Sequence, residues 1–263
     1  MKPFIKWAGG KRWLLDNEQF FLPDFDGRYI EPFLGGAAVF FHLAPERSIL
    51  SDVNPRLINT YKAVQSDWRL VENELKKMQK LHSKEYYYQE RDRKRRKSHT
   101  KAAQFLYLNR TCWNGLYREN LSGKFNVPIG TKSQVILADD NFEGVNKLLR
   151  NATLMVCDFE ETLATAGKGD LVFLDPPYTT AHNTNGFVKY NQKIFSWDDQ
   201  IRLRQCAEAA SQRGAKIVLT NANHETIHQL YSDLGAPEIV SRNSVISGNA
   251  SARGKTTEVL YVF

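Results

Sequence analysis

Short apolar runs recur along the two outer parts of the chain, and the first three end in an acidic residue or lead into a loop. They lie at residues 28–33, 48–52, 153–158, 171–175, 215–220 and 258–263, with residues 238–246 expected beside the last run. Runs of this length are typical of buried strands. A helical pattern begins after Ser196, an expected N-cap, and should stop at Gly214. Strands alternating with helices predict an α/β fold with a mostly parallel sheet that binds ligands at the carboxyl ends of its strands.

The middle third of the chain has a different pattern. Residues from about 56 to 110 are expected to be helical, with Leu70, Leu75, Met78 and Leu81 at helical spacing. The segment at about 112–133 is rich in aromatic residues, glycine and arginine, and it contains a tight turn at 122–124. This pattern predicts a basic β-hairpin carried on a helical platform.

Charge is concentrated in the same middle third. Of the net charge of +7, residues 61–149 hold 18 lysines and arginines against 10 acidic residues, and the rest of the chain holds 18 against 19. Residues 91–97 alone carry six positive charges in seven positions. This run is either a solvated helix face or a surface that binds a polyanion such as DNA or RNA.

Composition excludes several classes of protein. At 263 residues with 42% hydrophobic content, the chain suits one large domain or one domain with an insertion. No apolar run approaches the roughly 18 residues of a membrane span, so a soluble, unprocessed protein is expected. Three isolated cysteines, Cys112, Cys157 and Cys206, support neither a disulfide framework nor a metal site, and they fit a reducing cytoplasm.

The run Asp175-Pro176-Pro177-Tyr178 follows the apolar segment 171–174 and offers a carboxylate, free carbonyls and a flat aromatic ring. Because proline lacks an N–H group, the carbonyls around the two prolines remain available as acceptors. Such a site suits the exocyclic amino group of a nucleobase. Taken alone, the run favours a proline turn after a buried strand over such a site.

Two glycine-containing loops, residues 4–12 and 31–40, would let the backbone approach a ligand. Neither has the sequence of a P-loop, which argues against ATP hydrolysis. The second loop follows an expected strand and opens a helix. Asp52, 17 residues beyond Gly35, stands at the end of the next strand, where an acid commonly binds ribose in nucleotide sites.

Taken together and in order, these motifs resemble the Dam-type DNA adenine-N6 methyltransferases. The resemblance spans nearly the whole chain and rests on residues 6–11, 31–36, 51–54, 108–110, 114–118, 125–128 and 175–178. It implies a Rossmann-like methyltransferase sheet that uses S-adenosylmethionine and carries an inserted, mostly helical recognition domain with a β-hairpin. The expected catalytic domain is residues 1–56 and 150–263, and the expected recognition domain is residues 57–149, with the hairpin at about 112–133.

The resemblance also implies which residues bind the cofactor. The expected set is Trp7, Lys11, Phe33, Gly35, Asp52, Asp158 and Asp175. Asp52 would accept from the ribose hydroxyls and Asp158 would face the cofactor adenine, although Trp7 could be core, Lys11 a surface lysine and Asp158 a strand-end cap. Glu31 would either hold the first loop or contact the methionine amino group.

Catalysis by such an enzyme requires the target nucleotide to be flipped out of the duplex. Asp175 and the Pro176 carbonyl would hold the two N6 hydrogens, Pro177 would keep the run rigid, and Tyr178 would stack on the base. No metal and no covalent intermediate is expected. Phe187 and Tyr190 could complete the walls of the adenine pocket or be ordinary packing residues.

DNA recognition would belong to the hairpin. The expected contacts are Lys6, Trp113, Asn114, Leu116, Arg118 and Pro128. Arg118 is suited to a bidentate contact with guanine, and the matching positions of the resembled family read 5′-GATC. This chain has tryptophan at position 113, where tyrosine is common in that family, so the depth of an aromatic wedge is open.

Two other functions compete with this reading. An RNA adenine or DNA cytosine-N4 methyltransferase would use a similar amine pocket, but aspartate rather than serine at position 175 favours adenine. A nucleic-acid-binding regulator with an inactive pocket is the alternative outside enzymes. The expected partner is double-stranded DNA, and the expected state is a cytoplasmic, nucleoid-associated monomer without a membrane partner.

Overall fold

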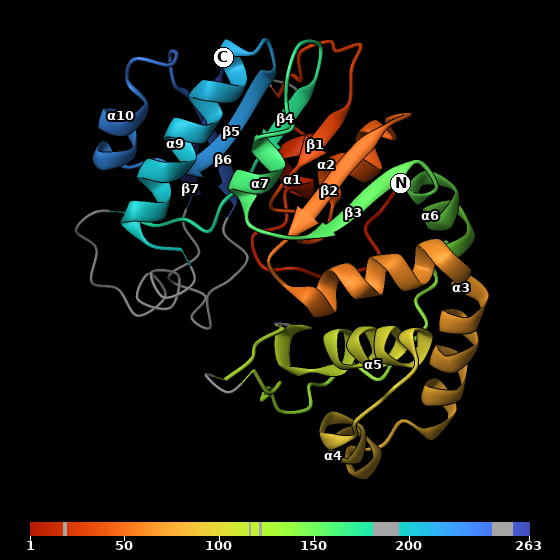
Figure 1. Ribbon diagram of the computed structural model, residues 1–263. Coiled ribbons are helices and arrows are strands. Elements are labelled where there is room, and N and C mark those ends of the chain that lie inside the picture. Colours follow the sequence, from red (N-terminus) through yellow and green to blue (C-terminus); the bar gives the residue numbers. More distant parts are fainter. Residues whose placement is uncertain (18–19, 116, 121–122, 181–194, 244–254) are drawn as a thin grey trace. The chain divides into compact units, whose positions relative to one another are not determined.

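The computed structural model describes residues 1–263 with the exception of 18–19, 116, 121–122, 181–194 and 244–254 (Figure 1). The described strands form one mixed sheet in the order β3-β2-β1-β4-β5-β7-β6. Their bounds are β1 Tyr29–Glu31, β2 Ser48–Asp52, β3 Ala152–Val156, β4 Leu171–Leu174, β5 Lys216–Ala222, β6 Glu238–Asn243 and β7 Lys255–Val262. Each apolar run identified in the sequence is a strand, so the predicted α/β class is confirmed.

Strand direction divides the sheet into two parts. β4 pairs in parallel with both β1 and β5, with Tyr29 opposite Leu171 and Leu171 opposite Lys216. β7 runs antiparallel to β5 and to β6, which confirms the expected neighbour of the last strand. The β4 side chains are all buried, as expected for a strand covered on both faces.

The chain divides into two compact units. The first comprises Met1–Arg12, Leu34–Glu46 and Leu50–Val156, and the second comprises Trp13–Phe33, Arg47–Ile49 and Cys157–Phe263. The helices are α1 Arg12–Leu15, α2 Ala38–Leu43, α3 Pro55–Leu81, α4 Lys84–Asp92, α5 Ser98–Thr111, α6 Phe142–Leu149, α7 Phe159–Leu163, α9 Trp197–Gln212 and α10 Glu225–Tyr231, with a short 3₁₀ turn at Trp113–Gly115. No helix in the described part of the chain has the length and apolarity required to cross a membrane.

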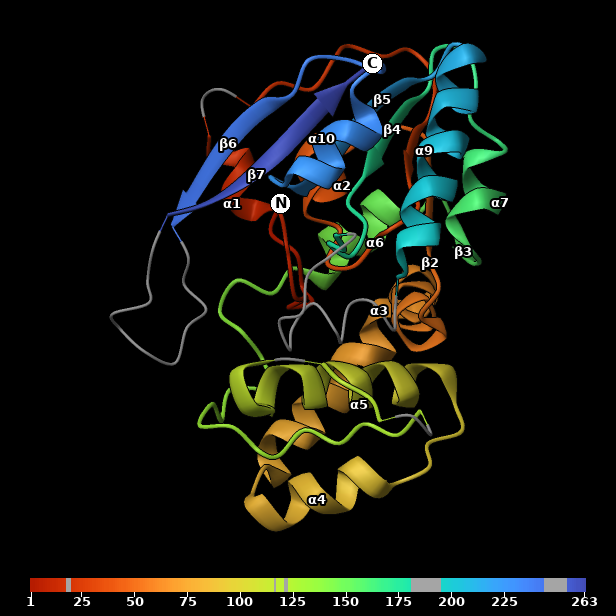
Figure 2. The same cartoon turned by 90° about the vertical axis from the view of Figure 1, so that its left-hand side faces the viewer.

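Helices α3 and α5 pack side by side in the first unit, and α4 packs on α5 (Figure 2). α3 begins after Asn54, whose side chain accepts from two backbone amides, and its backbone is not helical at Asp67 (φ −154°, ψ 91°). The four apolar positions expected to share a stripe all follow this interruption, and the buried stripe there runs through Val71, Leu75 and Met78. Leu75 and Met78 are buried as expected, but Leu70 and Leu81 are exposed, which corrects that part of the prediction.

The basic run at residues 91–97 does not form a helix face. α4 ends at Asp92, α5 begins at Ser98, and residues 93–96 between them are irregular. The polar sequence offers no apolar face that would hold these residues in a helix against the platform. The expectation of a continuous helical segment here is therefore wrong.

The predicted hairpin at about 112–133 is an antiparallel ribbon with little regular pairing. Among its described residues it has isolated bridges between Cys112 and Ile129 and between Glu119 and Phe125. The Trp113 amide donates to the Pro128 carbonyl at 2.9 Å. Asn114 and Gly115, between the bridges, adopt positive φ angles (54° and 63°), which turn the backbone away from a strand path.

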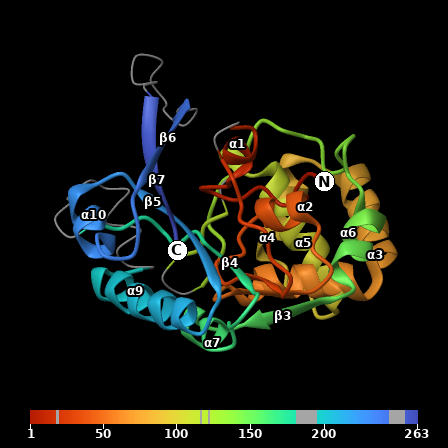
Figure 3. The same ribbon diagram turned by 90° about the horizontal axis from the view of Figure 1, so that it is seen from above.

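Helix α9 lies along one face of the second unit's strands, beside α7 (Figure 3). It begins with a capping box, in which Ser196 accepts from the Asp199 amide and the Asp199 carboxylate accepts from the Ser196 amide. It ends before Gly214, whose φ of 91° is unfavourable for residues with a side chain. Both predicted ends of this helix are confirmed.

Candidate functional site

The Asp175-Pro176-Pro177-Tyr178 run begins directly at the carboxyl end of β4. Leu174, the last strand residue, is fully buried, and Asp175 is partly exposed. The Thr220 hydroxyl, on the neighbouring parallel strand β5, lies 2.9 Å from an Asp175 carboxylate oxygen and 3.3 Å from the Leu174 carbonyl. Strand pairing thus places a hydroxyl donor beside the carboxylate at the end of the sheet where ligands bind in α/β proteins.

The other end of the run is also held. The Tyr178 hydroxyl donates to a Glu258 carboxylate oxygen at 2.6 Å. Burial, and then the carboxylates of Asp175 and Glu258, raise the pKa of Tyr178 well above its ordinary value, so the hydroxyl keeps its proton. Sequence reasoning missed both Thr220 and Glu258. The signal for Glu258 was a single acid within the otherwise apolar end of β7.

An aromatic cluster in the second unit surrounds Asp158. Phe33 stacks on Phe159 with ring centroids 5.5 Å apart and meets Phe195 edge-on at 5.7 Å. The Arg202 guanidinium lies 4.2 Å above the Phe159 ring. Phe33 and Asp158, both expected to bind the cofactor, therefore lie on one cluster because Asp158 immediately precedes Phe159.

Asp158 caps α7 and pairs with Arg202. Its carboxylate accepts from the Glu160 amide at 2.9 Å and from both terminal nitrogens of Arg202 at 2.6 and 3.0 Å. Burial opposes ionisation, but the hydrogen bonds from Arg202 and Glu160 outweigh it and hold the pKa of Asp158 below its ordinary value. Arg202 is a third residue that sequence reasoning missed.

The first unit places Asp52 under the glycine loop. Its two carboxylate oxygens accept from the Gly35 amide at 3.1 Å and from the Asn54 amide at 2.9 Å. Burial raises the pKa of Asp52 in spite of these two hydrogen bonds. Gly35 has φ of 46°, and a β-carbon there would lie 2.7 Å from the Trp7 indole. The indole can therefore occupy its place only because residue 35 is glycine.

The N-terminal loop is held by the end of α5. Asn109 accepts from the Lys6 amide at 3.0 Å and donates to the Lys6 carbonyl at 2.7 Å. Arg110 donates to the Phe4 carbonyl at 2.9 Å. Further along the loop, Lys11 is buried and donates to the Gly9 carbonyl at 2.9 Å. The Asn109-Arg110 pair therefore supports the loop from which Trp7 and Lys11 project.

The expected DNA contacts lie in the first unit with their side chains in solvent. Trp113, Asn114, Arg118 and Pro128 are exposed, and Leu116 lies outside the described residues. The Lys6 ammonium donates to the Asn114 carbonyl, and its side chain covers Gly115. Arg118 donates through Nε to the Asn126 side chain at 3.1 Å. Phe187 and Tyr190 also lie outside the described residues.

Tyr117, which the sequence did not single out as a contact, joins the ribbon to the N-terminal loop that carries Trp7. Its ring lies 4.5 Å from Phe105 and stacks with Trp7 at 5.9 Å, measured between ring centroids. Its hydroxyl donates to Glu119 at 2.6 Å and accepts from Arg56 at 3.2 Å. The packing of Tyr117 on Trp7 and Phe105 therefore holds the ribbon in place, in addition to the ribbon's backbone hydrogen bonds.

The basic run contains residues of two kinds. Arg95 is mostly buried and pairs with Glu90, which is fully buried, at 2.7 Å and with Glu74 at 3.1 Å. Arg93 also approaches Glu90, at 3.4 Å. Lys94, Arg96 and Lys97 are exposed. Arg95 therefore neutralises a buried carboxylate and does not belong to the exposed surface that the sequence predicted for the whole run.

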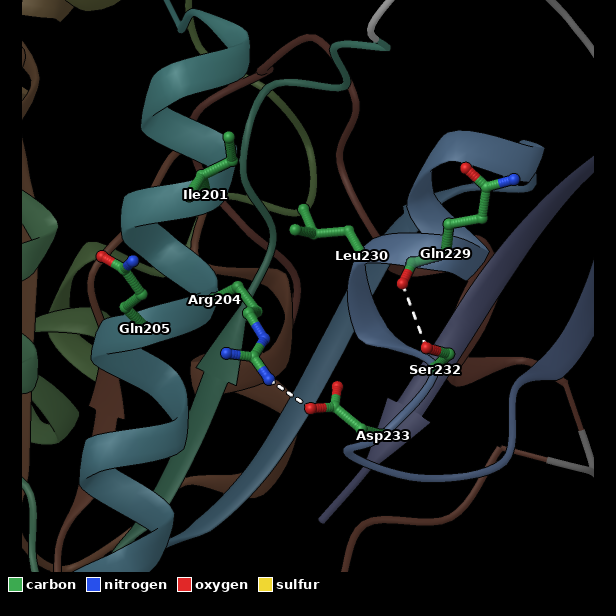
Figure 4. Close-up of a pocket in the computed structure, with 7 residues that line it drawn as sticks. All are labelled: Ile201, Arg204, Gln205, Gln229, Leu230, Ser232 and Asp233. Carbon is green, nitrogen blue, oxygen red and sulfur yellow. Dashed lines mark hydrogen bonds and ion pairs between the residues drawn. The ribbon is translucent and has the colours of Figure 1, made fainter.

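A depression of about 450 Å³ lies between α9 and α10 (Figure 4). Its lining residues are Ile201, Arg204, Gln205, Gln229, Leu230, Ser232 and Asp233. Arg204 pairs with Asp233, the other charged lining residue, and also with Glu208. The depression contains none of the residues expected from the sequence, and it shows no group suited to methyl transfer.

Comparison with known proteins shows the family of the chain. The sequence pattern of the family described as "D12 class N6 adenine-specific DNA methyltransferase" matches residues 7–245. The chain is 35% identical to the type II methyltransferase M1.LlaDCHI of Lactococcus lactis, over 99% of this chain and 94% of that protein. It is 37% identical to the type II methyltransferase M.MjaIII of Methanocaldococcus jannaschii, over 93% of each chain. It is 33% identical to the DNA adenine methylase of Vibrio cholerae, over 100% of this chain and 96% of that protein. The chain belongs to the D12 class of N6 adenine-specific DNA methyltransferases, as its motifs predicted.

Proposed function

We propose that this DNA adenine methyltransferase modifies the adenine of 5′-GATC, which it flips from the duplex into a site formed around Asp175. The observation that carries the proposal is the Asp175-Pro176-Pro177-Tyr178 run at the carboxyl end of β4, with its carboxylate beside Thr220 and its tyrosine bound to Glu258. GATC is supported by the DNA contacts expected from the sequence. Of these, Trp113, Asn114, Arg118 and Pro128 are exposed in the structure.

Positioning is the main catalytic resource of such a site. Asp175 and the Pro176 carbonyl would accept the two N6 hydrogens, which directs the nitrogen lone pair out of the purine ring. Tyr178 would stack on the flipped base and offset part of the cost of extrusion, which is about a few kcal/mol. Holding the nucleophile in line with the methyl group converts a bimolecular encounter into an oriented reaction.

Family membership implies S-adenosylmethionine as the methyl donor, which supplies an electrophilic methyl group on a sulfonium when bound. The residues of each unit fit parts of this molecule. In the first unit, Asp52 is a partly exposed acceptor that holds the amide of Gly35, a buried glycine whose missing β-carbon leaves room for the Trp7 indole. In the second unit, Asp158 is an ionised acceptor next to the Phe33 and Phe159 rings, which suits an aminopurine. Trp7 and Lys11 are proposed to complete the set.

Asp52→Ala is expected to weaken cofactor affinity about 100-fold, because two hydrogen bonds from the ribose hydroxyls to a carboxylate would be lost. Calorimetry of S-adenosylmethionine binding measures this, with the exposed Asp139→Ala as the control. Because burial raises the pKa of Asp52, affinity should already decline at a pH above the ordinary aspartate range as the carboxylate takes up a proton. An unchanged dissociation constant would remove Asp52 from the cofactor site.

Recognition is proposed for the insert at residues 57–149, with the ribbon at 112–133 reading base edges and residues 1–56 and 150–263 forming the catalytic domain. Arg118 can form the bidentate contact with guanine, once its Nε bond to Asn126 has oriented it. Lys6 and Asn114 are proposed to act as a pair, since the lysine holds the backbone of the asparagine. Trp113 is proposed as the aromatic wedge.

The exposed part of the basic run is proposed to bind phosphates. Replacing Lys94, Arg96 and Lys97 together by glutamine should weaken binding to cognate and non-cognate DNA alike. If all three contact phosphates, the slope of log affinity against log salt falls by about 2 to 3. Binding titrations from low to moderate salt on both duplexes measure this. Asp92→Asn, a neighbouring exposed change, is the control, and an unchanged slope in the triple variant would identify the run as a solvated surface.

Sequencing DNA that the purified protein has methylated tests the proposal as a whole. N6-methyladenine confined to 5′-GATC is the expected result. Modification at another adenine-containing sequence would refute the proposed site while leaving the family activity intact.

A further inference from the structure

Glu258 is a buried carboxylate that belongs to none of the motifs. It lies on β7 opposite Ala222 of β5, and only 2% of its surface is exposed. A carboxylate in such a place is costly unless hydrogen bonds or charges compensate for its lost hydration. The residue that hydrogen-bonds to Glu258 therefore indicates what role this carboxylate has.

That partner is the tyrosine of the catalytic run. The distance of 2.6 Å between the Tyr178 hydroxyl and Glu258 Oε2 is typical of a hydrogen bond to an ionised carboxylate. At the other end of the run, Asp175 is bound by Thr220, two residues before Ala222 on β5. Two adjacent strands thus each hold one of the chemically active residues.

Anchoring the hydroxyl has a geometric consequence. The oxygen lies at the far end of the tyrosine side chain, so fixing it selects one χ1 rotamer and sets the direction of the ring. Because its pKa is raised, the Tyr178 hydroxyl is a hydrogen-bond donor to Glu258 at neutral pH. The ring is therefore directed before any base arrives.

We propose that Glu258 is a positioning residue for methyl transfer, which holds the Tyr178 ring in the orientation that receives an extrahelical adenine. The inference rests on the proposed role of Tyr178. It assigns to the C-terminal strand a part in catalysis, although Glu258 itself would touch neither the base nor the cofactor.

Four variants test the role: Glu258→Leu, Glu258→Gln, Tyr178→Phe and the double variant Glu258→Leu/Tyr178→Phe. Glu258→Leu is expected to lower kcat about 10- to 100-fold through misplacement of the ring, with S-adenosylmethionine affinity within about twofold of the parent. Glu258→Gln keeps an acceptor oxygen and should recover most of kcat. Glu238→Gln, an exposed change on β6, is the control and should leave kcat and S-adenosylmethionine affinity unchanged.

The double variant separates positioning from mere support of the fold. If Glu258 acts through the Tyr178 hydroxyl, Tyr178→Phe should lower kcat about as much as Glu258→Leu does. The double variant should then have a kcat no lower than that of either single variant. 2-Aminopurine at the target adenine should give altered fluorescence in the same variants, reporting a changed base environment. Glutamine and phenylalanine are mild changes, so the test does not depend on whether the leucine variant folds.

Other outcomes overturn the proposal. If the fold-decreases in kcat of the two single variants multiply in the double variant, the two residues act independently. Parallel losses in melting temperature, cofactor affinity and kcat would show a purely structural role. Tyr178→Ala separates the proposed role of Tyr178 from the inferred role of Glu258. If Tyr178→Ala remains fully active, the proposed role of Tyr178 fails. If Tyr178→Ala is inactive while Glu258→Leu is fully active, only the inference about Glu258 is refuted.

Discussion

Asp175→Asn is expected to lower kcat for DNA methylation about 1,000-fold while changing S-adenosylmethionine affinity by less than about threefold. The substitution keeps the shape of the side chain but removes the negative charge that stabilises the positive charge developing on N6. Loss of one preorganised electrostatic contact commonly costs about 10² to 10³ in rate. Methyl incorporation into a GATC duplex and calorimetry with the cofactor together measure the two effects.

The control for this prediction is Asp198→Asn, an exposed carboxylate in the first turn of α9. It should leave both quantities unchanged. Asp175 also stands among the residues expected at the cofactor, so the affinity measurement decides between its two possible roles. A loss of affinity equal to that of Asp52→Ala would show that both acids bind the cofactor and that the division of labour proposed for them is wrong.

Local sequence signals predicted the strands and the helix ends well because few other contacts compete with them. The 48–52 run is a strand with those same bounds, and Ser196 caps α9 through its own first turn. Hydrophobic alternation and capping depend on neighbours within a few residues, so they are visible in the sequence. The antiparallel direction of β7 against β5 depends on long-range pairing, which the strand pattern alone does not encode.

The errors have a common physical origin in interactions between distant segments. Leu70 and Leu81 were expected in one helical stripe, but the buried stripe of α3 runs through Val71, Leu75 and Met78, and Leu81 is the last residue of the helix. Arg95 looked like one of five equivalent charges, yet it pairs with Glu74, 21 residues away. Glu258 and Tyr178 are 80 residues apart, so no local pattern indicates that they meet.

Arg110 illustrates how such distant contacts shape a motif. The resemblance to the methyltransferase family included Leu108-Asn109-Arg110 without giving these residues a role. In the structure, Arg110 makes two hydrogen bonds of 2.7 Å with Asp140 and binds the carbonyls of Phe4 and Val135. Its side chain is 3% exposed and that of Asp140 is 6% exposed. One buried guanidinium therefore ties three segments of the first unit together.

Arg110→Met is accordingly expected to lower the free energy of unfolding by about 3 to 5 kcal/mol, because it leaves the Asp140 carboxylate buried without its main counter-charge. Urea denaturation measures the loss, and the double variant Arg110→Met/Asp140→Leu should recover part of it, since removing both charges removes the uncompensated one. The control is Lys147→Met, which breaks an exposed pair with Glu143 and should cost about 0.5 kcal/mol or less. If Arg110→Met unfolds at the same urea midpoint as the parent protein, the role assigned to the Arg110–Asp140 pair is contradicted. If the pair holds the N-terminal loop through Phe4, the folded fraction of the variant should also bind S-adenosylmethionine more weakly, because Trp7 and Lys11 project from that loop.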